Sequence, residues 1–277
     1  MERRDILKAA AIVGLAATAQ TAKANLLTPG TRPSPEPLES DGVEKAQNYI
    51  ILETFFTTSN EKRDALAKKF DAELIPLRHE IGFEKVGVFT VNHDLMEGDR
   101  GYDAEKFDGA VFVVQETSSI ELLLNYQDIS AKTATKFNLD DDLDFVDEEI
   151  VALRAFPSVP SINVPNSNEG RVLQLRTYNS PNYERNIMKE AMFEDGELEI
   201  FLKSGMEPVF FGRSLFGSMA PNVTYMLSFE SDEARREGWS KFVGSDEWKK
   251  MSADPKYERT ATRIRNLFLN PTANSDI

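Results

Sequence analysis

The sequence predicts an α+β protein in which one β-α-β-β-α-β unit occurs twice. Residues 52–55 (LETF) return as residues 175–178 (LRTY), 123 positions later. Residues 82–86 (GFEKV) return as residues 205–209 (GMEPV) at the same offset. Two matches at one offset indicate a duplicated unit of fixed length. We therefore expect any functional site to sit between two related halves.

The spacing of apolar residues predicts the elements of the first copy. Residues 49–57 are rich in aromatic and β-branched side chains, which is typical of a strand. Residues 62–80 place Leu66, Phe70, Leu74 and Leu77 at helical spacing. Residues 86–91 and 110–115 predict the second and third strands. A short helix then begins with Ser118 as its N-cap, and residues 150–156 form the fourth strand.

The second copy repeats this order of elements. Residues 172–178 predict a strand, residues 182–203 a helix and residues 209–216 the next strand. A strand at 223–229, a helix at 232–243 followed by Trp248, and a last strand at 262–269 complete the copy. Each copy is therefore predicted to be a ferredoxin-like split unit.

A third match locates an insertion in the first copy. Residues 116–118 (ETS) align with residues 230–232 (ESD) at an offset of 114, which is 9 less than 123. We therefore expect 9 extra residues between the second and third strands of the first copy, within residues 93–107.

The alternation of side chains along strand 172–178 separates two faces. Residues 173, 175 and 177 form an apolar set, whereas Gln174, Arg176 and Tyr178 form a polar set. We expect the apolar set to lie under the helices and the polar set to face the sheet of the sister copy. Two ferredoxin-like domains would then pair as an intrachain dimeric α/β-barrel with a polar-lined interior.

The N-terminus predicts export. Arg3 and Arg4 begin a twin-arginine signal peptide over residues 1–24, with a short apolar run at 9–19 and an AKA cleavage site. The run is shorter than the ~20 apolar residues of a membrane span, so we expect no stable anchor after cleavage. A proline-containing flexible linker at 25–46 precedes predicted domains at 47–160 and 169–272. The predicted location is periplasmic or extracellular, in a bacterium.

Composition narrows the classes of partner and cofactor. The net charge of −14 argues against nucleic acid, whose phosphates would be repelled. The chain has no cysteine and only two histidines, so we expect no metal site. It contains no phosphate-binding loop or dinucleotide fingerprint, and we expect no cofactor. A small-molecule ligand and a homo-oligomer remain open.

The second copy resembles the NIPSNAP family. Residues 172–178 (VLQLRTY) resemble the E-L-R-T-Y opening strand of that family, and residues 205–209 its G-x-x-x-V turn. Residues 233–237 with 246–248 resemble its second helix and D-P-E-W turn. The resemblance implies the dimeric α/β-barrel fold, whose superfamily includes small monooxygenases and haem enzymes. In the first copy, Glu53 and Phe55 replace the arginine and tyrosine of the family, and Trp248 has no counterpart.

Glu53 and Arg176 occupy equivalent positions and carry opposite charges. Across a shared barrel they would approach each other at the pseudo-twofold axis. One interpretation is a structural ion pair that fixes how the copies dock. The other is a guanidinium that holds an acidic or carbonyl ligand, with Tyr178 as a hydrogen-bond donor and Gln174 beside it. Glu53 could serve as a base there.

The strand at 209–216 supplies two further candidate residues. Phe211 and Arg213 share one face, and Phe210 lies on the other. The phenylalanines are either core residues under the helices or, for Phe211, an apolar pocket wall with Arg213 at its mouth.

Three functions remain open. The first is a protein that binds a small, partly apolar ligand inside the barrel. The second is a cofactor-independent monooxygenase of the α/β-barrel type. The third is a structural or assembly module with a filled barrel. A cavity of ~300 Å³ or more, lined by the polar set and Phe211, would favour the first two.

Overall fold

The computed structural model describes residues 48–96, 103–139 and 145–277. The predicted signal peptide and linker lie outside these residues. The first half contains four strands: β1 (Tyr49–Thr57), β2 (Lys85–Val91), β3 (Ala110–Thr117) and β4 (Phe145–Ala155). Its helical segments are α2 (Asn60–Lys69), η2 (Phe70–Leu74), α3 (Ile75–Ile81), α4 (His93–Met96), α5 (Ala104–Phe107), α6 (Ile120–Leu124) and α7 (Tyr126–Phe137).

The second half repeats the order of strands and principal helices. Its strands are β5 (Val172–Asn179), β6 (Glu207–Gly217), β7 (Asn222–Phe229) and β8 (Arg263–Pro271). Its helical segments are α9 (Tyr183–Met192), η3 (Phe193–Glu197), α10 (Leu198–Lys203), α11 (Asp232–Gly244), α12 (Asp246–Ser252) and η4 (Pro255–Tyr257).

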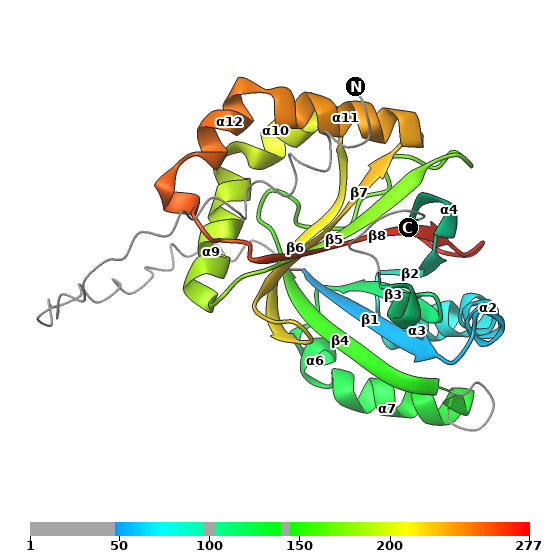
Figure 1. Ribbon diagram of the computed structural model, residues 1–277. Helices are drawn as coiled ribbons and strands as arrows, with labels where there is room; N and C mark the ends of the chain where they lie inside the picture. The colour runs from blue at the N-terminus through cyan, green and yellow to red at the C-terminus, as the bar shows by residue number, and fades with distance from the viewer. Residues whose placement is uncertain (1–47, 97–102, 140–144) are drawn as a thin grey trace, which may run out of the picture. The chain divides into compact units, whose positions relative to one another are not determined.

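The eight strands close one barrel, in the order β1-β3-β2-β8-β5-β7-β6-β4 (Figure 1). Each half contributes a four-stranded sheet with the ferredoxin-like order, and the seams join β2 to β8 and β4 to β6. The second strand of each copy therefore pairs with the fourth strand of the other. This pseudo-twofold arrangement confirms the predicted intrachain dimeric α/β-barrel.

The barrel interior holds the apolar set, which corrects the prediction of its faces. Leu175 is 3% exposed and belongs to the same core as Leu52, its equivalent in the first half. The interior of an eight-stranded barrel is narrow enough for side chains to fill, and here those side chains are mostly apolar. The same core includes Ile50, Phe89, Phe112, Val114, Leu153, Leu173, Phe210, Met226, Leu267 and Leu269.

The polar set Gln174, Arg176 and Tyr178 faces the helices instead. Gln174 accepts a hydrogen bond from the indole of Trp239 on α11, and Tyr178 packs against Phe193 of η3. The expected polar-lined interior is therefore wrong. Among the better-formed cavities, one at a mouth of the barrel measures about 20 Å³, room for roughly one water molecule.

Capping residues mark the duplication. Ser59 and Asn182 accept hydrogen bonds from the first turns of α2 and α9, at positions 123 apart. Ser119 and Ser231 do the same for α6 and α11, at positions 112 apart. The cap of α6 is therefore Ser119 and not the predicted Ser118.

The strand register revises the predicted insertion. β1 pairs Leu52 with Val114, and β5 pairs Leu175 with Met226. Val114 and Met226 are thus equivalent at an offset of 112, and not 114. The offset between the copies is 123 before this segment and 112 after it. The first copy therefore holds 11 extra residues between β2 and β3. Helices α4 and α5 lie in this segment.

The first helix of each copy is interrupted at the same place but by different geometry. Segments η2 and η3 begin at Phe70 and Phe193, which are 123 positions apart, and both rings are fully buried. Segment η2 is a π-helical turn, whereas η3 contains Gly196 at a φ of 139°, which kinks the helix. Both copies therefore retain the place of the interruption but not its form.

Charged bridges join the two halves beyond the strand pairing. Glu190 on α9 binds both Arg154 of β4 and Arg213 of β6. Arg265 of β8 binds Glu149 of β4 at 3.4 Å, near the barrel mouth. Among the described residues, no helix is long and apolar enough to cross a membrane.

Replacing Leu52 or Leu175 with alanine tests the shared interior. Each change removes a buried side chain from the barrel, so each is expected to lower the free energy of unfolding by about 2–5 kcal/mol. Because both halves close one barrel, chemical denaturation should show a single transition that shifts in both variants. Leu124→Ala, at a position that is 70% exposed, should change stability by under about 0.5 kcal/mol. Two transitions, only one of which moves, would contradict the shared interior.

Candidate functional site

Arg176 lies at the centre of a polar and aromatic layer between β5–β8 and their helices. The carbon of its guanidinium is 4.5 Å from the ring centre of Trp239 and 5.3 Å from that of Tyr178. Gln174 accepts from Trp239 Nε1 at 2.8 Å and donates to Asn266 at 2.7 Å. The indole is thereby held against the face of Arg176, a geometry that stabilises the cation.

A pair of buried phenols borders Arg176. Tyr225 Oη donates to Tyr178 Oη at 2.8 Å, and the Tyr225 ring stacks on Phe211 with 4.6 Å between ring centres. Burial raises the pKa of Tyr225 well above its ordinary value, so this phenol stays protonated at neutral pH. The structure therefore brings Gln174, Arg176, Tyr178 and Phe211 together, as predicted, but outside the barrel.

The guanidinium of Arg176 has unused hydrogen-bonding capacity. Its Nε is buried and lacks a hydrogen-bond partner among the described residues. Among the described residues, no carboxylate forms a salt bridge with Arg176. The Arg176 residue is itself only partly buried. Burial acts to lower the pKa of Arg176, but Tyr178, Tyr225 and Glu197 outweigh that effect and raise it. The group is a cation that no carboxylate contacts within the part of the chain that the structure describes, although the charge of Glu197 acts on it.

The nearest carboxylate, Glu197, is engaged elsewhere. Lys189 Nζ donates to Glu197 Oε2 at 2.7 Å, and both side chains are almost fully buried. Burial raises the pKa of Glu197 against the opposing effect of Lys189. The ammonium also lies 4.2 Å from the centre of the Phe193 ring. This ion pair joins α9 to the last residue of η3.

Glu53 does not meet Arg176, so the predicted ion pair across the pseudo-twofold axis is wrong. Glu53 lies under the helices of the first half, where Arg78 Nη2 binds its Oε2 at 3.3 Å. Both side chains are 0% exposed. The two equivalent residues point outward from opposite sheets because the barrel interior is apolar.

Arg78 and Phe201 are equivalent at the 123-residue offset. In the first half, Arg78 supplies an internal cation for Glu53. In the second half, Phe201 packs against Trp239, with 5.7 Å between ring centres, and supplies no charge for Arg176. One copy is therefore neutralised internally and the other is not.

Arg213 is not at a pocket mouth near Phe211. Its guanidinium Nε contacts Glu190 Oε2, and the same carboxylate binds Arg154 at 3.2 Å. We therefore assign Arg213 to the contact between the halves.

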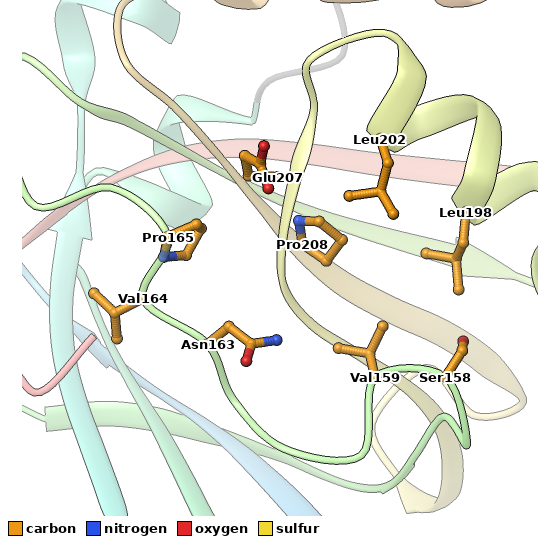
Figure 2. Close-up of a pocket in the computed structure, with 9 residues that line it drawn as sticks. All are labelled: Ser158, Val159, Asn163, Val164, Pro165, Leu198, Leu202, Glu207 and Pro208. Carbon is orange, nitrogen blue, oxygen red and sulfur yellow. The ribbon is translucent and has the colours of Figure 1, made fainter.

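The largest of the better-formed pockets is a surface groove of about 530 Å³ beside α10 (Figure 2). Leu198 and Leu202 point from α10 toward Val159 and Pro208, across the groove (Figure 2). Ser158, Asn163 and Glu207 add polar atoms to its wall. None of the predicted site residues lines it.

Comparison with known families decides the identity of the second half. Residues 173–276 match the NIPSNAP family model. The second half of the chain is a NIPSNAP domain. Arg176 and Tyr178, which carried the resemblance, lie on the first strand of this NIPSNAP domain. No curated protein matches the chain in sequence.

Two solved structures share the barrel across both halves. A proposed monooxygenase from Fusobacterium nucleatum has a TM-score of 0.57 at 9% identity and covers 81% of this chain and 92% of its own. A second, from Lactobacillus acidophilus, has a TM-score of 0.50 at 13% identity, with 81% and 94% covered. Likeness at this identity establishes the fold alone.

Four residues of the layer escaped sequence reasoning: Tyr225, Trp239, Lys189 and Glu197. The 123-residue offset offered a signal for two of them, because Lys189 and Glu197 stand where the first copy has Leu66 and Leu74. No group of three or more potential metal ligands occurs within the described ranges.

The duplication suggests a test of the buried Lys189–Glu197 pair. Glu197→Leu alone leaves the buried ammonium of Lys189 without its carboxylate partner, so it should lower the free energy of unfolding by about 3–5 kcal/mol. The double change Lys189→Leu with Glu197→Leu reproduces the first copy and should recover most of that loss. Urea denaturation of the two variants measures the difference. Equal losses in both would show that the pair does not depend on mutual neutralisation.

Proposed function

We propose that the NIPSNAP domain binds a small organic anion, or a carbonyl compound, through Arg176. The site is the layer between β5–β8 and the helices, with Trp239, Tyr178 and Tyr225 as its aromatic wall. The observation that carries the proposal is a cation held between aromatic rings, with no carboxylate of the described residues in contact.

The charge of Arg176 supports an anionic ligand. A guanidinium offers planar, paired donors that match a carboxylate or carbonyl oxygen. Trp239 fixes its plane, and Tyr178 presents a phenol beside it. A ligand would supply the counter-ion that Glu53 receives from Arg78 in the first half.

The apolar residues inside the barrel bear on the three functions considered from the sequence. They argue against a polar ligand site between the two sheets, because Gln174, Arg176 and Tyr178 face the helices instead. The Arg176 layer is a separate place, between the sheet of the NIPSNAP domain and its helices, and ligand binding is proposed there.

A cofactor-independent monooxygenase is the second candidate. The two similar structures are described as proposed monooxygenases, and they support this reading through fold alone. The buried Tyr178–Tyr225 pair favours it, because an oxygenase needs groups that orient a phenolic or carbonyl substrate. Binding at Arg176 is a requirement of both candidates.

We also propose export of the chain after cleavage behind Ala24, on the strength of the twin-arginine pattern. Expression in a bacterium with a twin-arginine system should yield a periplasmic protein beginning at Asn25. Replacement of Arg3 and Arg4 by lysine should retain it in the cytoplasm. An uncleaved N-terminus in the periplasmic fraction would contradict the proposal.

Benzoate and benzamide test the charge preference of the site. Titration calorimetry should show benzoate binding at least tenfold more tightly than its neutral isostere. Arg176→Gln should weaken benzoate binding by about 10- to 100-fold, because a hydrogen bond to a charged group contributes roughly 1.5–3 kcal/mol.

Arg263→Gln is the matched control, since Arg263 is an exposed arginine on β8. It should leave benzoate binding unchanged. Equal affinity of the wild-type protein for benzoate and benzamide, or an equal loss in both variants, would contradict the assignment of Arg176.

A further inference from the structure

A buried polar cluster in the first half is chemically different from the Arg176 layer. Its centre is Glu53, whose Oε2 accepts from Tyr126 Oη at 2.7 Å and from Arg78 and Gln115 at 3.3 Å each. These four side chains come from β1, α7, α3 and β3, and each is at most 4% exposed. Four separate elements therefore converge on one carboxylate.

Glu148 places a second carboxyl group beside the first. Glu148 on β4 is directly opposite Phe55, two positions from Glu53 on the same face of the sheet. Such diagonal neighbours lie within reach of long side chains. Ser130 Oγ donates to Glu148 Oε1 at 2.7 Å, and the side chain is half-buried. Glu148 thus connects the buried cluster to solvent.

Four polar atoms of the cluster are buried and have no hydrogen-bond partner among the described residues. They are Glu53 Oε1, Arg78 Nε, Arg78 Nη1 and Gln115 Oε1. A buried polar group that is left unpaired costs about 1–3 kcal/mol. The set includes two donors and two acceptors, so it is complementary to a molecule that can both donate and accept.

The charges of the cluster balance if one proton is present. Arg78 neutralises one carboxylate, and the described groups facing the pair add only neutral hydroxyls and an amide: Ser130, Tyr126 and Gln115. Burial and the neighbouring Glu53 raise the pKa of Glu148 to about 8. Burial also raises the pKa of Tyr126 well above its ordinary value, so that phenol remains a donor.

We propose that Glu53 and Glu148 form an acid–base site that shares one proton and binds a small neutral molecule between Arg78 and Gln115. The shared proton satisfies Glu53 Oε1. The ligand accepts hydrogen bonds from Arg78 and donates one to Gln115 Oε1. An anion would compete with Glu53 for Arg78, and a cation would be repelled by Arg78, so the ligand class is a neutral amide, alcohol or similar compound.

This site does not depend on the proposed role of Arg176. The two clusters lie on the outer faces of different sheets, one in each half. They also suit different ligands. The Arg176 layer holds a cation that no described carboxylate contacts and suits an anion, whereas the Glu53 cluster is internally neutral and suits a neutral molecule.

Infrared spectroscopy tests the shared proton. At pH 7 the wild-type protein should show the carbonyl stretch of a buried carboxylic acid, and Glu148→Gln should lose it. Glu149→Gln is the matched control: Glu149 is the next residue on β4 but binds Lys106 and Arg265. It should keep the band. Absence of the band in the wild-type protein, or its persistence in Glu148→Gln, would overturn the proposal.

Acetamide and acetate are the probes for the ligand. NMR titration should show acetamide shifting resonances of Gln115 and Tyr126 at least tenfold more effectively than acetate. Gln115→Leu should abolish the shift, and Glu149→Gln should retain it. No shift with acetamide, or equal shifts with both probes, would overturn the assignment of a neutral ligand.

The stability of the protein should report the same proton. The pKa of Glu148 is raised in the folded state from 4.5 to about 8. Its protonation therefore stabilises the fold fully below pH 4.5, and this contribution is lost as the pH rises through about 8. Glu148→Gln should flatten the dependence of the urea midpoint on pH in this window. An unchanged slope would overturn the proton-sharing pair.

Discussion

The structure depends on the closure of one barrel by strands from both halves. Because β2 pairs with β8 and β4 with β6, neither sheet has a free edge, and the inward faces of all eight strands share one largely apolar interior. That enclosure selects Leu52, Leu175 and their neighbours for the inside. Polar side chains at alternate positions are then forced outward, under the helices. Each half consequently has its own outer layer in which polar chemistry can develop independently.

The two outer layers have diverged while their frame has stayed constant. In the first, Glu53 is held by Arg78, and a second carboxyl group stands beside it. In the second, Arg176 occupies the position of Glu53, and Phe201 that of Arg78. The difference between Glu53 and Arg176 reverses the sign of the central charge. The difference between Arg78 and Phe201 leaves the second layer without a counter-ion at the position that supplies it in the first layer. The halves are equivalent in topology but differ in the charge at the centre of their outer layers.

Sequence reasoning recovered the eight strands and the principal helices, because the repeat let each element be read twice. It predicted only a short helix where α6 and α7 continue to Phe137, and it began the last strand of the first copy at 150, whereas β4 begins at Phe145. It also identified Gln174, Arg176, Tyr178 and Phe211 as a group. It failed on the direction in which they point, since alternation separates two faces but does not say which is the interior of a closed barrel. It also missed Trp239 and Glu148, which reach the layers from distant segments whose positions depend on tertiary packing. The predicted offset of 114 was wrong because it was based on a match of only three residues, whereas the pairing of the strands gives an offset of 112.

The interruption of the first helix in each copy has a consequence for what lies beyond it. Arg78 follows the π-helical turn of η2, and Phe201 follows the kink at Gly196 in η3. A π-turn holds one residue more than an α-turn, whereas the glycine kink breaks the helix through a left-handed backbone. The two copies therefore bring their helices back onto the sheet by different local geometries. What reaches the outer layer at that point, a guanidinium in one copy and a phenyl ring in the other, is carried on helices whose second halves are oriented independently of their first.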